Sequence, residues 1–261
     1  VLTMELRRIT EKQLKDFMHR YDRGGLANKE SPNHGKVYTA GNSASQINKM
    51  VEFFRNVFEI GVRGGIMHVN PARNLERKPV RPKLLHLPST EQFKRMVDAV
   101  RASQGWGRVA GDLMEGLAYS GMRLGESRRM HWEHLDFDRG MMTVYGTKTL
   151  SSARVIPMLD AFRALTLRIR EHKDYKSTDR VFQANVCQES LKRACKVVGV
   201  RKMTHHDLRR LFATTCIEAG VDIPTVALWL GHKDGGVLAM RTYGHIRPAH
   251  SVEAAKKVKF A

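Results

Sequence analysis

A basic tract with two prolines, Lys78-Pro79-Val80-Arg81-Pro82-Lys83, constrains the fold more than any other part of the sequence. Proline has no amide hydrogen to donate and holds the residue before it in an extended conformation, so this tract cannot continue a helix or fill a central strand. We interpret it as a linker, and a length of 261 residues leaves room for a modest domain on each side. The predicted divisions are a first domain at 1–77, the linker at 78–87 and a second domain at 88–261.

The first domain is predicted to be helical. Thr10 and Gln13 have the spacing of a capping box, in which two residues at a helix start bond each other's backbone amides. Apolar residues then recur every three or four positions from Leu14 to Tyr21, and again from Ser45 to Ile60. The polar, glycine-bearing segment 24–42 separates these two helices.

The second domain has a mixed pattern. A further capping box, Ser89 with Gln92, opens a helix, and helical spacing returns over 109–119 and after residues 160, 188 and 204. Between them, the segments 141–145 and 154–157 are typical of two short strands joined by a turn. The expected fold class is therefore mainly α with a small antiparallel β-sheet (α+β).

The charge balance indicates a polyanionic partner. Lys and Arg number 45 against 26 Asp and Glu, which gives a formal net charge of +19. The excess is spread along the chain instead of sitting in one tail, as expected for a basic surface that faces nucleic acid. A basic ribosomal or membrane-surface protein would have the same total, so charge alone does not decide between these classes.

Cysteine usage and apolar runs bear on the compartment. Cys187, Cys195 and Cys216 are odd in number and lack metal-ligand spacing, so we expect reduced thiols of a cytosolic protein. The longest apolar runs fall short of the ~18 residues that span a bilayer, so no membrane association is expected. The start, Val1-Leu2-Thr3, has neither an initiator Met nor a signal-peptide pattern, and we expect that an upstream segment is missing.

Two segments before residue 150 carry side chains suited to phosphoryl chemistry. The sequence Ser120-Gly121 predicts a glycine turn that brings Arg123 to a helix start. Glu126 follows three positions later, where it is either a partner of the active-site residues or part of a plain helix salt bridge. Lys148 lies at the tip of the predicted hairpin, where most lysines are simply solvated.

The last part of the chain carries the remaining candidates. His206 and Arg209 are three positions apart on a predicted helix and therefore share a face. Gly231 ends the following helix immediately before His232, and Tyr243 comes shortly after.

In order and approximate spacing, Arg123, Lys148, the His206-x-x-Arg209 pair, Gly231-His232 and Tyr243 resemble the catalytic set of the tyrosine recombinase (phage integrase) family. The match covers 88–247, and the helices before it resemble the family's core-binding domain. The resemblance implies that Tyr243 is the nucleophile and that a 3′-phosphotyrosyl intermediate keeps the bond energy, so that religation needs no ATP.

The chemistry of strand cleavage explains why these residue types are needed. Negative charge grows on the non-bridging oxygens of the phosphodiester, and the planar guanidinium groups of Arg123 and Arg209 can contact both oxygens. His206 is the candidate base for Tyr243, and His232 would donate a hydrogen bond to the phosphate. Lys148 would protonate the leaving 5′-oxygen. The scheme needs no metal and no cofactor.

Further expectations concern partners and context. We expect contacts with DNA phosphates from a set of basic side chains, Lys49, Lys78, Arg81, Lys83 and Arg154. The resemblance implies a homo-tetramer on two double-stranded DNA sites, with accessory DNA-bending proteins. The resemblance also implies that the protein integrates or excises a mobile element. It would be encoded by a bacterium or a phage and would act in the cytoplasm, at the nucleoid. A tail helix at 251–260 would pack on a neighbouring protomer or on its own domain.

Three alternatives stay open beside this interpretation. The helices from Thr204 and Asp222 resemble a helix-turn-helix, which suggests a DNA-binding regulator, although the second helix has a core-like composition. A type IB topoisomerase shares similar active-site chemistry. A metal site at His205-His206 or at His131 and His134 is disfavoured, because no thiol or carboxylate completes either set.

Overall fold

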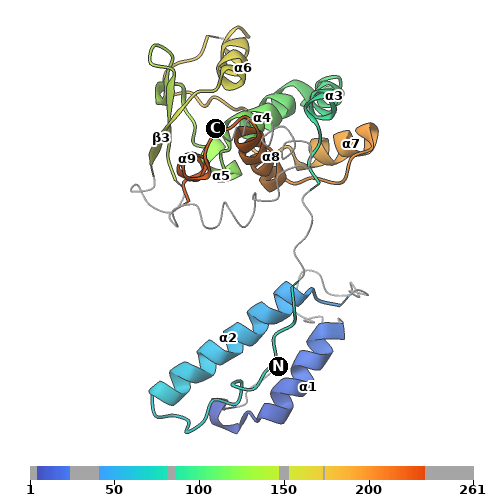
Figure 1. The fold of residues 1–261 in the computed structure, drawn as a ribbon, viewed down its shortest axis with the longest axis vertical. Helices are drawn as coiled ribbons and strands as arrows, with labels where there is room; N and C mark the ends of the chain where they lie inside the picture. Colours follow the sequence, from blue (N-terminus) through green and yellow to red (C-terminus); the bar gives the residue numbers. More distant parts are fainter. Residues whose placement is uncertain (1–4, 24–40, 81–85, 147–152, 173, 233–261) are drawn as a thin grey trace, which may run out of the picture. The chain divides into compact units, whose positions relative to one another are not determined.

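The computed structural model describes residues 5–23, 41–80, 86–146, 153–172 and 174–232. The chain divides into two compact units, Val1–Leu84 and Leu85–Ala261 (Figure 1). The division between Leu84 and Leu85 falls inside the segment 78–87 that was predicted to be a linker. Tyr243, Lys148, Arg81, Lys83 and the tail at 251–260 lie outside the described residues.

The first unit is built on two helices, α1 (Glu11–Arg23) and α2 (Ala44–Arg63), preceded by a short 3₁₀ helix, η1 (Leu6–Arg8). Both predicted helices are confirmed. The Thr10 amide donates to Gln13 Oε1 at 2.9 Å, and the Gln13 amide donates to Thr10 Oγ1 at 3.3 Å, so the predicted capping box is present. The core of this unit lies between the helices and the chain that follows them, and consists of Leu14, Met18, Ile47, Val51, Phe58, Ala72 and Leu75.

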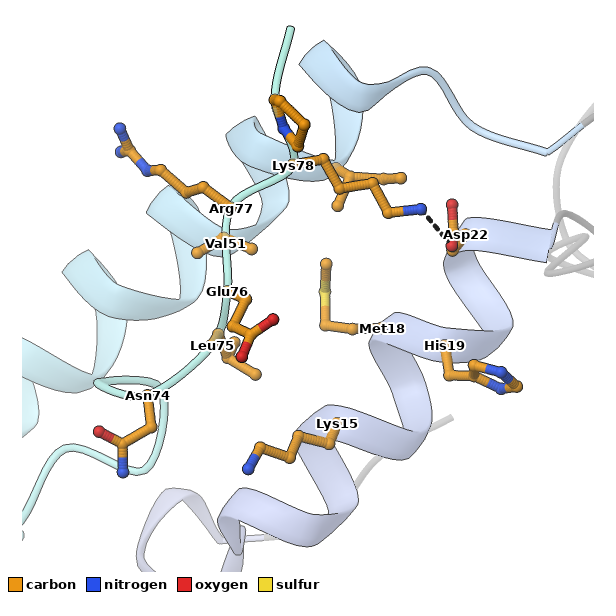
Figure 2. A pocket seen from close by; sticks show the side chains of 12 residues that line it. Lys15, Met18, His19, Asp22, Val51, Asn74, Leu75, Glu76, Arg77 and Lys78 are labelled. Carbon is orange, nitrogen blue, oxygen red and sulfur yellow. Dashed lines mark hydrogen bonds and ion pairs between the residues drawn. The ribbon is translucent and has the colours of Figure 1, made fainter.

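The beginning of the predicted linker packs on the first unit. Asn48 on α2 accepts from the Lys78 amide at 2.8 Å and donates to the Lys78 carbonyl, also at 2.8 Å. The Lys78 ammonium forms an ion pair with Asp22 on α1 (Figure 2). An asparagine side chain can replace a neighbouring strand as a donor and acceptor, so residue 78 is part of the first unit rather than of a free spacer.

The second unit is a helical domain arranged around α4. Its helices are α3 (Thr90–Arg101), α4 (Gly107–Ser120), α5 (Leu124–Ser127), α6 (Asp160–Arg170), α7 (Gln188–Val198), α8 (His205–Glu218) and α9 (Ile223–Leu230). Helix α4 packs against α3, α6 and α8, and nearly all of its residues are buried. Its Gly116 has no side chain because the Phe182 ring occupies that space, 2.3 Å from where a Cβ would stand.

A small antiparallel sheet completes the second unit, with strands β1 (Leu135–Asp136), β2 (Met141–Val144) and β3 (Arg154–Pro157) in the order β1-β2-β3. Met142 pairs with Ile156 across the predicted hairpin, and both are buried. The strand β1 was not predicted, because two residues are too short for a periodicity, and it follows the 3₁₀ helix η2 (Trp132–His134). The predicted fold class, mainly α with a small antiparallel β-sheet, is confirmed.

Two smaller expectations can be compared with the structure. All three cysteines are buried and free of disulfides, and burial raises the pKa of the Cys187 thiol to about 12, which makes it unreactive. Over the described ranges, we find no helix that combines the length and the apolar character needed to cross a membrane.

Candidate active site

Arg123 is presented by a tight turn at the end of α4. Gly121 ends that helix in the left-handed conformation, with φ +64°, and a Cβ there would lie 2.4 Å from a ring carbon of Phe212. Only glycine satisfies both requirements. The chain then turns so that the Arg123 amide donates to Glu126 Oε2 at 2.8 Å and α5 begins. The glycine turn predicted from the sequence is therefore present.

Helix α8 positions His206 and Arg209. At its start, the Thr204 amide and hydroxyl both donate to Asp207 Oδ2 at 2.8 Å, which fixes the first turn. Arg209 lies one turn further on and is 1% exposed. Its Nη1 donates to the Gly121 carbonyl at 2.6 Å, and its Nη2 donates to the Leu230 carbonyl. Arg209 thus joins the end of α4 to the end of α9.

The carboxyl end of α9 closes the site. Asp222 caps the start of this helix, and Gly231 ends it with φ +65°. The His232 amide then donates to the Ala227 carbonyl at 3.0 Å, so the half-buried His232 is held directly after the helix. The last carbonyls of a helix carry partial negative charge, and they attract guanidinium groups here: the Leu230 carbonyl also accepts from Arg123 Nη1 at 3.4 Å.

Glu126 lies at the centre of this cluster and is 2% exposed. Its carboxylate accepts from Arg123 Nη1 at 2.9 Å, and Arg209 Nη1 is 4.0 Å from Oε2. Arg154 on β3 binds the same carboxylate with both terminal nitrogens, at 3.1 and 2.9 Å. Burial raises the pKa of Glu126, but the hydrogen bonds and charges of Arg154 and Arg123 outweigh burial and hold the pKa below its usual value. Glu126 is therefore ionised at neutral pH.

The described part of the site thus brings Arg123, Arg209, His206 and His232 to neighbouring helix ends, with Glu126 behind them. The family model described as "Phage integrase family" matches residues 89–250 of this chain. The chain belongs to the phage integrase family. It is a tyrosine recombinase, an enzyme that cuts and rejoins DNA strands in site-specific recombination.

Curated relatives of this recombinase are similar over much of its length. The ICEBs1 integrase of Bacillus subtilis (strain 168) is 22% identical over 98% of this chain and 72% of its own length. Tyrosine recombinase XerA of Thermococcus kodakarensis is 29% identical over 68% of this chain and 63% of its own length.

Solved structures share the fold. The Tn1549 transposon integrase in complex with a circular intermediate DNA has a TM-score of 0.70 and 14% identity, over 97% of this chain and 87% of its own. A lambda integrase dimer bound to a COC′ core site has a TM-score of 0.67 and 19% identity, over 93% and 82%.

His206 of the recombinase has the properties of a proton acceptor. It is exposed at the start of α8, on the side of the helix shared with Arg209. Partial desolvation and the charges of Arg210 and Arg209 lower its pKa below the usual 6.5, and Asp207 opposes the shift without reversing it. The imidazole is therefore neutral at pH 7 and can take a proton.

His205 has a different environment from its neighbour. Its Nε2 is 3.1 Å from the Cys187 amide, which donates to it. The ring therefore holds the chain before α7, while the ring of His206 faces solvent. Within the described ranges, no group of three or more His, Cys, Asp or Glu side chains could hold a metal ion.

The basic residues predicted to contact DNA have different positions. Lys49 is exposed on α2, and Lys78 is paired with Asp22 as described above. Arg154 has a side chain that is only 8% exposed, and its guanidinium is directed into the protein, against Glu126 and the Trp229 carbonyl. Its contact with DNA stays a prediction. Sequence reasoning had no signal for the pairing of Arg154 with Glu126, because the two residues are 28 positions apart.

Proposed function

We propose that this enzyme is an integrase that cleaves DNA with Tyr243 through a 3′-phosphotyrosyl intermediate, needs neither metal nor ATP, and integrates or excises a mobile element. The observation that carries the proposal is the convergence of Arg123 and Arg209 on the Leu230 carbonyl beside Glu126. Two guanidinium groups held this way supply the fixed positive charge that phosphodiester cleavage requires.

Each remaining group has a role that its surroundings support. Neutral His206 takes the proton of the Tyr243 hydroxyl, whose usual pKa of ~10 makes it a poor nucleophile without a base. His232, held after Gly231, donates to a non-bridging oxygen of the phosphate. Lys148 gives a proton to the leaving 5′-oxygen, and the resulting hydroxyl later attacks the phosphotyrosine to restore the DNA.

The proposed substrate is double-stranded DNA, bound by a homo-tetramer on two sites with accessory DNA-bending proteins. The net charge of +19 supports a polyanionic substrate and predicts binding that weakens steeply with salt. The role in a mobile element is supported by the similarity to an ICEBs1 integrase and to a transposon integrase. Such an enzyme would act in the bacterial cytoplasm, at the nucleoid.

The alternative of a non-catalytic helix-turn-helix regulator has less support. A recognition helix exposes polar side chains to the bases. The second helix of the pair, α9, buries Val226, Ala227 and Leu230 instead, and its exposed Leu228 is apolar. That helix contributes its carboxyl end to the site and its apolar face to the core.

A covalent-trapping assay tests the proposal. The protein is incubated in EDTA with a nicked duplex carrying the attachment site, and products are separated on a denaturing gel beside Tyr243→Phe. We expect a protein–DNA adduct with the native chain and none with the variant, which removes only the hydroxyl. Tight DNA binding without any adduct, or an equal adduct from Tyr243→Phe, would overturn the proposed mechanism.

A further inference from the structure

Arg154 is a third guanidinium behind the two that are assigned to the phosphate. Its two terminal nitrogens bind both oxygens of Glu126, at 3.1 and 2.9 Å, and its Nε donates to the Trp229 carbonyl at 2.7 Å. Every guanidinium nitrogen of Arg154 therefore has a partner inside the protein. With a side chain only 8% exposed, Arg154 is unsuited to a direct phosphate contact and well suited to holding other groups.

The charges around Glu126 show what Arg154 does for its neighbours. Among the described residues, the carboxylate in contact with Arg123 is that of Glu126, and it is ionised in spite of its burial. Without Arg154, its negative charge would be shared between Arg123 and Arg209, and both would offer a weaker field to an incoming phosphate. The bidentate pair with Arg154 takes up much of the charge of the carboxylate, so Arg123 and Arg209 together keep a net positive charge for an incoming phosphate.

The Nε contact fixes the chain that carries His232. Arg154 joins β3 to the last turn of α9, where Trp229 and Leu230 expose their carbonyls, two or three residues before His232. The fit is close, because a Cβ on Gly231 would lie 3.1 to 3.3 Å from three atoms of the Arg154 side chain. Glycine at 231 thus leaves room for the Arg154 guanidinium as well as adopting a positive φ.

We propose that Arg154 is a positioning residue of the recombinase, which neutralises Glu126 and fixes the end of α9 so that Arg123 and Arg209 remain available to the scissile phosphate. The proposal rests on the function proposed above. Arg154 then acts indirectly in catalysis instead of binding DNA directly. Once Arg154 is removed, the charge of Glu126 should slow cleavage by drawing on Arg123 and Arg209.

The test measures the rate of adduct formation at saturating nicked DNA, together with DNA affinity and thermal unfolding. We expect Arg154→Gln to bind DNA normally and to form adduct roughly 100-fold more slowly. Arg154→Lys keeps the positive charge, so its rate of adduct formation should fall less than that of Arg154→Gln. The double variant Arg154→Gln/Glu126→Gln should be faster than Arg154→Gln alone, because removing the unpaired carboxylate relieves Arg123 and Arg209.

A matched control separates this role from a structural one. Arg101 is also an arginine ion-paired to buried acids, with its Nη2 at 2.6 Å from Asp112 in the middle of α4. Arg101→Gln should lower the melting temperature without slowing adduct formation at saturating DNA.

The outcomes distinguish the inference from the function on which it rests. The inference is supported if the native chain forms the adduct, Arg154→Gln forms it slowly and the double variant forms it faster than Arg154→Gln. Two results would overturn the inference alone, provided that the native chain forms the adduct. One is that Arg154→Gln forms the adduct at the native rate. The other is that the double variant is no faster than Arg154→Gln. Failure of the native chain to form any adduct on a validated attachment site would overturn the proposed function, and the inference with it.

Discussion

Two clusters of arginines and carboxylates in the described part of the second unit are built in opposite ways. In the cluster on α4, the buried groups are the acids Asp112 and Glu115, and the arginines reach them from the surface, with side chains 24% exposed for Arg101 and 44% for Arg168. In the cluster around Glu126, two of the arginines are themselves buried, with exposures of 2% for Arg209 and 8% for Arg154.

The difference lies in how the charge is compensated. Around α4, the positive groups keep contact with water, so the cluster is satisfied by itself and needs no ligand. Around Glu126, three guanidinium groups share one carboxylate and the carbonyls at the ends of α4 and α9. Carbonyl dipoles satisfy hydrogen bonds without cancelling a full charge. Such a cluster is suited to an anion, because its excess positive charge is buried, whereas the arginines of the α4 cluster are exposed to solvent.

The largest expected effect comes from Arg209→Lys. A lysine cannot reach the Gly121 and Leu230 carbonyls together while facing the phosphate, since it lacks the planar fork of donors. We expect adduct formation to fall on the order of 1,000-fold at saturating DNA. Single-turnover kinetics beside the native chain measures it, and a loss under tenfold would contradict a direct role for this guanidinium.

Gly231→Ala should affect the site cluster without removing a charge. The alanine would have to keep an unfavourable positive φ, and its Cβ would crowd the Arg154 side chain. We expect about 1–3 kcal/mol of lost stability, and a slowing of adduct formation that persists at temperatures where the variant is fully folded. Gly199→Ala has a similar φ of +75° and open space around it, so it is the matched control for strain alone.

Arg101→Gln should affect stability and leave catalysis unchanged. It removes the cation between Asp112 and Glu115 and leaves both buried carboxylates with fewer partners. Because the Arg101 side chain is partly exposed, we expect a destabilisation of about 2 kcal/mol in chemical denaturation, below the loss for a fully buried pair. An equal slowing of adduct formation by Arg101→Gln and Arg154→Gln would remove the distinction between the two clusters.

The pH dependence tests the lowered pKa of His206. Partial desolvation, followed by the charges of Arg210 and Arg209, holds the folded pKa of His206 below 6.5, so the neutral form should persist to lower pH than in the unfolded chain. The unfolded chain then binds more protons, and the stability from this group is full above pH 6.5 and decreases as pH falls below it. Adduct formation should likewise decline only below pH 6.5, measured between about pH 5 and 8. A decline already above pH 7 would contradict a lowered pKa for His206, and His206→Gln should flatten the profile.

The smallest effect is expected for Arg108→Gln. Arg108 lies on the rim of the α4 cluster, 3.8 Å from Asp112, with a side chain that is 47% exposed. Solvent screens this pair, so we expect less than about 0.5 kcal/mol in stability and no change in catalysis. A larger loss would mean that the α4 cluster is less well compensated than its geometry indicates.

Much of the fold and part of the site could be predicted from the sequence, because the deciding interactions are local. The capping residues Thr10, Ser89 and Asp222 lie within three positions of the amides that they bind. Likewise, Gly121 is next to the turn that it permits.

The rest depends on contacts between distant segments. Nothing near Arg154 in the sequence indicates that it pairs with Glu126, and its basic character favoured a DNA contact instead. The carbonyls of Trp229 and Leu230 could not be predicted either, since every residue has a carbonyl and only the folded ends of helices direct them to one point. The Asn48 contact that holds residue 78 on the first unit also joins positions 30 apart.

A structure of Tyr243→Phe bound to a duplex with an intact scissile phosphate would test most directly which arginines bind the phosphate. We expect the non-bridging oxygens of this phosphate to contact Arg123 and Arg209, while Arg154 stays on Glu126. A phosphate bound by Arg154, with Glu126 released, or a phosphate that contacts neither Arg123 nor Arg209, would contradict this expectation.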